Sequence, residues 1–89
     1  MKYNSRSFLN KSTGLAAIEI SVATTSTYVD ANLAISDCNK VVNIDLSSAS
    51  KESFKNKLAK LNKLINELTS LETVLKDLQA SPEFTTYFK

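Results

Sequence analysis

This chain of 89 residues contains no histidine and no tryptophan, and it has one cysteine, one glycine and one proline. Without histidine, catalysis by a Ser–His or Cys–His pair is excluded. A single cysteine, Cys38, can build neither an intrachain disulfide nor a zinc site. One glycine cannot form a glycine-rich phosphate-binding loop. We therefore expect a protein that is not an enzyme and that needs no cofactor or metal ion.

The chain also has little net charge, because 11 basic and 9 acidic residues leave only +2. This balance does not by itself indicate a nucleic-acid-binding protein. No apolar run reaches the ~18–20 residues that a membrane span needs. A lone cysteine without a disulfide framework suits a reducing compartment. We expect a cytoplasmic protein that does not contact the membrane.

A chain of this length is expected to form a single domain, residues 1–89, with a small hydrophobic core. Small domains commonly stabilise such a core with disulfides, metal ions or oligomerisation. Since the first two are excluded here, the sequence favours association with a second copy or with another protein.

Three stretches in the first half alternate apolar and polar residues, which is typical of half-buried β-strands. They lie within residues 15–47, at 15–25, 28–36 and 41–47. If residues 26–27 and 37–40 close two hairpins, every apolar side chain falls on the same sheet face. We therefore predict a three-stranded antiparallel meander. Its apolar rows are Ile20, Leu33 and Ile44; Ile18, Ile35 and Val42; and Val22, Ala31 and Leu46.

The opposite face of this predicted sheet is small and polar. A solvated face is the simplest interpretation, and the functional alternative is a flat docking surface or a small polar ligand site. The face has no aromatic platform of the kind that RNA-binding sheets use. Residues 1–13 are expected to add either a fourth, edge strand or an arm that wraps a neighbour. The candidate residues of the polar face are Glu19, Ser21, Asn32 and Asp45.

Residues 50–80 are predicted to form one long amphipathic helix. Ser48 or Ser50 can cap its start, and Pro82 limits its end. At 1.5 Å per residue the helix is about 45 Å long, which exceeds the length of short strands. The expected fold is therefore α+β, with the sheet followed by one C-terminal helix that packs on one sheet face and overhangs it.

Leucines on this helix occupy consecutive a and d positions of a heptad repeat. The apolar stripe is wider than a coiled-coil seam, because Leu58, Ile65 and Val74 flank it. One interpretation is packing on the sheet alone. We prefer the sheet together with a partner helix, since a wide stripe can face two elements. The predicted self-association residues are Leu61, Leu64, Leu68, Leu71, Leu75 and Leu78.

Charge is distributed unevenly along the helix, with a net +4 in its first half and −2 in its second. This gradient runs against the helix dipole, whereas an antiparallel copy would set each basic half against an acidic half. We therefore predict an antiparallel homodimer or a higher even oligomer. The lysines have a second interpretation as contacts to phosphate groups or to an acidic protein. These lysines are Lys51, Lys55, Lys57, Lys60 and Lys63.

The last residues, 81–89, contain three aromatic side chains that are expected to pack on the sheet or at a dimer contact, or to act as a recognition tail. They are Phe84, Tyr87 and Phe88.

Three classes of function agree with these patterns. The first is a small binding protein that self-associates and binds or inhibits another macromolecule, a character shared by small inhibitors from phages and mobile elements. The second is a binder of nucleic acid or of a small anionic nucleotide ligand, through the lysines and the polar sheet face. The third is a structural subunit of a larger assembly.

Overall fold

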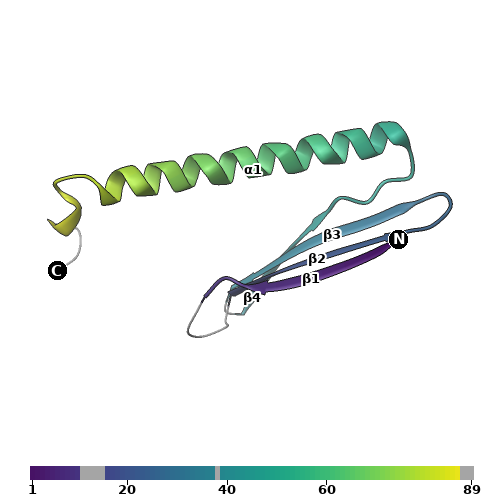
Figure 1. The fold of residues 1–89 in the computed structure, drawn as a ribbon, viewed down its shortest axis with the longest axis horizontal. Coiled ribbons are helices and arrows are strands. Elements are labelled where there is room, and N and C mark those ends of the chain that lie inside the picture. The colour runs from purple at the N-terminus through teal and green to yellow at the C-terminus, as the bar shows by residue number, and fades with distance from the viewer. Residues whose placement is uncertain (11–15, 38, 87–89) are drawn as a thin grey trace. The chain divides into compact units, whose positions relative to one another are not determined.

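The computed structural model describes residues 1–10, 16–37 and 39–86. Its fold is α+β, as the sequence predicts, with an antiparallel sheet followed by one long C-terminal helix (Figure 1). The chain divides into two compact units, residues 1–58 and 59–89. The elements in chain order are β1 (Lys2–Phe8), β2 (Ala16–Thr24), β3 (Val29–Asp37), β4 (Lys40–Asp45), α1 (Lys51–Gln79) and the 3-10 turn η1 (Phe84–Thr86).

The sheet has four strands in the order β1-β2-β3-β4, each antiparallel to its neighbours. The predicted register is confirmed, because Ile20 pairs with Leu33 and Leu33 pairs with Ile44. Of the two alternatives for the N-terminal residues, the structure shows the edge strand, since β1 pairs with β2 along its whole length. Alternation therefore gives the sheet one apolar face and one polar face.

The two hairpins of the predicted meander turn where the sequence places them. The backbone N–H of Thr25 donates to the carbonyl oxygen of Tyr28 at 2.9 Å, which closes a two-residue loop at 26–27. The second hairpin is closed by the pairing of Asp37 with Lys40. Cys38 lies in that loop and outside the described residues. The short loops fix the register of β2, β3 and β4.

Burial is shallow throughout the described residues. The buried apolar side chains are Ala16, Ala17 and Leu33, and of these only Leu33 is large. Leu33 lies in the middle of the apolar face, between Ile20 and Ile44. The sheet is therefore held mainly by cross-strand pairing and by partly covered apolar rows.

Helix α1 begins at a serine cap. The Ser50 hydroxyl accepts a hydrogen bond from the backbone N–H of Ser53 at 3.0 Å, so Ser50 and not Ser48 is the capping residue. The helix ends before Pro82, and the chain then makes the short turn η1. No side chain of α1 is buried. The prediction that α1 packs on a sheet face stays a prediction.

No helix among the described residues is both long enough and apolar enough to cross a membrane.

Candidate functional site

The six predicted self-association leucines all lie on α1 and share one face of it. Their spacing of three and four residues keeps them within roughly 100° of arc around the helix axis. Leu61 and Leu64 are half-buried, whereas Leu68, Leu71 and Leu75 are 53–55% exposed. We call this set, Leu61, Leu64, Leu68, Leu71, Leu75 and Leu78, the leucine seam.

The leucine seam ends in an apolar hollow. The half-buried ring of Phe84, from η1, lies beside the last leucines and lines the same hollow. This hollow has a volume of about 520 Å³, which is enough for side chains of another helix. Of the predicted aromatic tail, Phe84 is thus placed at the seam, and Tyr87 and Phe88 lie outside the described residues. The other lining residues are Leu68, Leu71, Glu72, Leu75, Lys76, Leu78 and Gln79.

The back of the helix is polar. The Thr69 hydroxyl donates to the Ile65 carbonyl oxygen at 2.9 Å, and the Thr73 hydroxyl donates to that of Thr69 at 3.0 Å. At the edges of the seam, ion pairs at four-residue spacing join Lys63 to Glu67 and Lys76 to Glu72. The contrast between an apolar seam and a polar back identifies the seam as the face that can bind another apolar surface.

The five candidate lysines lie on the first half of α1, but they do not share a face. Because a helix turns once every 3.6 residues, Lys57 projects from nearly the opposite side to Lys55. Lys63 is engaged by Glu67 at 3.1 Å. The structure therefore does not gather these lysines into one stripe that would follow a phosphate backbone.

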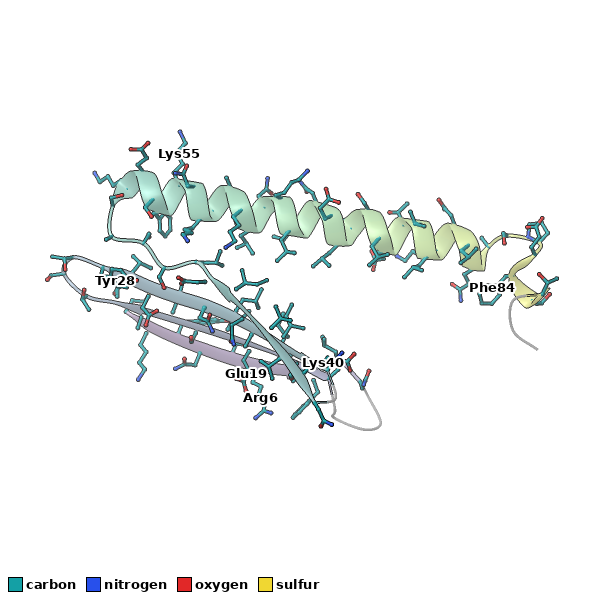
Figure 2. All side chains as sticks on the ribbon, turned by 180° about the vertical axis from the view of Figure 1, so that it is seen from behind. Arg6, Glu19, Tyr28, Lys40, Lys55 and Phe84 are labelled. Carbon is teal, nitrogen blue, oxygen red and sulfur yellow. The ribbon has the colours of Figure 1, made fainter. Side chains whose placement is uncertain are left out.

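The polar face of the sheet carries its candidate residues close together. Glu19, Ser21 and Asn32 line one shallow hollow of about 410 Å³ with Arg6 of β1. The Arg6 guanidinium pairs with Glu19 at 3.0 Å and lies 5.2 Å from the centroid of the Phe8 ring (Figure 2). Asp45 pairs with Asn32 across the strands. The sequence patterns did not identify Arg6, because the register of β1 was not known.

Asp45 has a structural role at the end of β4. Its carboxylate accepts a hydrogen bond from the Ser47 backbone N–H at 2.9 Å. The Ser47 hydroxyl in turn donates to the Asp30 carboxylate at 3.0 Å. Both carboxylates therefore hold the segment that leaves the sheet, where β4 gives way to the helix.

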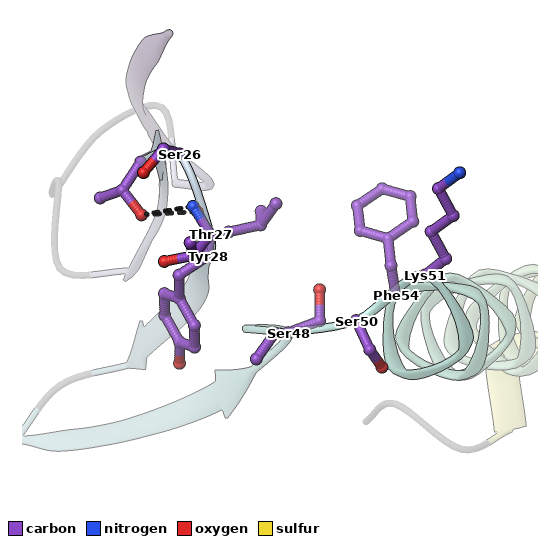
Figure 3. Close-up of a pocket in the computed structure, with 10 residues that line it drawn as sticks. Ser26, Thr27, Tyr28, Ser48, Ser50, Lys51 and Phe54 are labelled. Carbon is purple, nitrogen blue, oxygen red and sulfur yellow. Dashed lines mark hydrogen bonds between the residues drawn. The ribbon is translucent and has the colours of Figure 1, made fainter.

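A third hollow lies at the start of α1, and sequence reasoning missed it. It is formed by the 25–28 turn and by the segment 48–54, which are far apart in sequence (Figure 3). Both segments belong to the unit of residues 1–58. An isolated bridge holds them together, because Val29 and Ser48 exchange two backbone hydrogen bonds of 2.8 Å. We call it the cap hollow; among its lining residues are Thr25, Tyr28, Ser48, Ser50, Lys51 and Phe54.

Metal binding has no site in the described part of the chain, where no three acidic or cysteine side chains come together in a way that could hold an ion. No family model, no curated protein and no solved structure matches this chain.

Proposed function

We propose that this chain is a non-enzymatic binding protein that pairs with a second copy of itself through the leucine seam. The pair is antiparallel and uses its remaining surfaces to bind or inhibit another macromolecule. The observation that carries the proposal is the leucine seam itself, whose side chains at 68, 71 and 75 are more than half exposed.

A solvent-exposed seam is a poor basis for a stable helix of 29 residues. Most of the stability of protein helices comes from packing of an apolar face, and helix propensity adds little. Burying half a leucine side chain contributes about 1 kcal/mol, so six leucines on each of two helices supply a substantial driving force. A second copy offers an apolar stripe of the same length and spacing.

The charge of α1 favours the antiparallel orientation. Its first half carries five lysines against Glu52, and its second half carries Glu67, Glu72 and Asp77 against Lys76. Parallel copies would set lysines beside lysines, whereas antiparallel copies set the basic half against the acidic half. The charge pattern therefore selects one orientation over the other.

The spacing of the seam also fixes a register. With the twofold axis between residues 69 and 70, Leu68 meets Leu71 of the second copy, and Leu61 meets Leu78 of the second copy. In this register every seam leucine faces a leucine. The hollow beside Phe84 then receives the leucines from the first half of the opposite seam.

Sedimentation equilibrium of the full chain at micromolar concentration tests the proposal. We expect the mass of a dimer or of a higher even oligomer. A mass of 9.8 kDa at that concentration, which is the mass of one chain, would falsify self-association. That result would instead assign the seam to the sheet of the same chain or to another protein.

The second part of the proposal is that the dimer binds another macromolecule, with the polar sheet face as its contact surface. This face presents Arg6, Glu19 and the 60%-exposed ring of Phe8. Affinity capture from nuclease-treated host extract would compare the unmodified chain with Glu19→Arg and with Glu83→Arg, a matched charge reversal at an exposed residue outside the sheet and α1. A partner that Glu19→Arg loses and Glu83→Arg keeps supports the assignment. A partner that both variants retain would contradict the assignment of the polar sheet face as the contact surface.

A further inference from the structure

The cap hollow contains groups that self-association through the seam does not use. It is lined by residues 25–29, 48–51 and 54, and its volume of about 610 Å³ is within the usual range of small-molecule sites. The leucine seam lies entirely beyond residue 58. A ligand in the cap hollow and a second copy on the seam would therefore contact different parts of the chain.

The Ser48 side chain is the first indication of a ligand. The backbone of Ser48 is fixed by two hydrogen bonds to Val29, and the residue is only 4% exposed. Its hydroxyl nevertheless has no hydrogen-bond partner. Figure 3 shows this hydroxyl pointing into the space between the 25–28 turn and Phe54. Buried hydroxyls in folded proteins are normally hydrogen-bonded, so this group indicates an acceptor or donor that enters the hollow.

The remaining polar groups of the cap hollow favour an anion. Lys51 lines it, and the hollow lies at the N-terminus of α1, where the helix dipole is positive. The Ser50 hydroxyl accepts from Ser53 and still has its own proton to donate. None of the described residues that line the hollow is acidic. Glu52 stands in the first helical turn but does not line it.

Two aromatic rings border the same space. Tyr28 is 44% exposed and Phe54 is 46% exposed, and both line the hollow. Exposed aromatic rings provide stacking surfaces for planar bases. The cap hollow thus combines exposed aromatic rings with a lysine and a helix N-terminus.

We propose that the cap hollow binds a nucleoside phosphate. The phosphate group accepts hydrogen bonds from the Ser48 and Ser50 hydroxyls and pairs with the Lys51 ammonium group. The base lies against Tyr28 or Phe54. The site is independent of the leucine seam and does not rest on the proposed dimer.

The test is an NMR titration of the full ¹⁵N-labelled chain with three probes: adenosine 5′-monophosphate, adenosine and inorganic phosphate. We expect the monophosphate to shift the amide signals of residues 25–29 and 48–54. It should bind about ten-fold more tightly than inorganic phosphate, because base stacking adds to the phosphate contacts. Inorganic phosphate binding as tightly as the monophosphate overturns the assignment to a nucleoside phosphate.

Two variants and one control separate binding from folding. Lys51→Ala should weaken the monophosphate about ten-fold, and Lys40→Ala, a lysine outside the hollow, should leave it unchanged. Ser48→Ala should also weaken binding of the monophosphate. The melting temperature of this variant should equal or exceed that of the unmodified chain, because alanine removes an unpaired buried hydroxyl. Absence of amide shifts at millimolar monophosphate, or equal losses in Lys51→Ala and Lys40→Ala, overturns the proposal.

Discussion

The sheet and the C-terminal helix differ in how far they cover their apolar side chains. In the sheet, apolar residues meet across strands, and Leu33 is buried between its neighbours on β2 and β4. On α1 the apolar residues recur every three or four residues, and none of them is buried. The sheet thus completes its apolar contacts partly within the chain. The helix has an apolar face that is suited to a second chain.

The largest expected effect is on dimerisation, and it comes from a substitution in the leucine seam of α1. Leu68→Asp places a carboxylate at the centre of the proposed seam, once in each copy. We expect the dimer dissociation constant to rise by about 100-fold or more, because apolar burial is lost and a charge would be buried without a partner. Sedimentation equilibrium measures the change.

The matched control for this substitution is Asn66→Asp, which adds the same charge two residues away on the polar back of α1. It should leave the dimer intact. Equal dissociation by both variants would show that helix charge matters and the seam does not.

The next largest effect is on the free energy of unfolding, and it comes from a substitution in the sheet. Leu33→Ala should lower the free energy of unfolding by about 2–4 kcal/mol, because it leaves a gap between Ile20 and Ile44. Urea denaturation at a fixed protein concentration measures this, since dimerisation makes stability depend on concentration. Asn32→Ala, on the opposite face of the same strand, should change the value by less than about 1 kcal/mol. If the two variants lose the same amount, the sheet does not derive its stability from the apolar rows.

The strands and the helix could both be predicted from the sequence, for a physical reason that they share. Alternation predicted β2, β3 and β4 and their register, because a shift of one residue would have moved Ile20, Leu33 and Ile44 onto different faces. The serine cap and Pro82 predicted the ends of the helix to within one residue, since the predicted range 50–80 compares with Lys51–Gln79. These signals are local and repetitive, so they can be read from a single chain.

The cap hollow could not be predicted in the same way. Ser48 is polar and stands among other serines, and nothing in that pattern indicates a buried side chain. Its burial follows from the bridge to Val29, which brings the 25–28 turn against the helix start. The lysines of α1 are the opposite case. They cluster in the sequence, but they do not share a face of the helix.

The smallest expected effect concerns the helix start. Ser50→Ala removes the cap and should lower the free energy of unfolding by about 1 kcal/mol. Ser70→Ala, in the middle of the helix and without a capping role, should leave stability unchanged or raise it by a few tenths of a kcal/mol, about the propensity difference. Far-UV circular dichroism during urea denaturation measures both. A Ser50→Ala variant as stable as Ser70→Ala would contradict the assignment of the cap.

The most direct measurement of the central claim is a pulsed electron spin resonance distance between identical labels on two copies. Cys38→Ser provides the background, with labels at Lys55→Cys or Ser70→Cys. An antiparallel pair centred between residues 69 and 70 separates the Lys55→Cys labels by about 44 Å along the helix axis, and the Ser70→Cys labels by about 2 Å. A parallel pair would give the same short distance at both positions, and a monomer would give none. Either of those results contradicts the account.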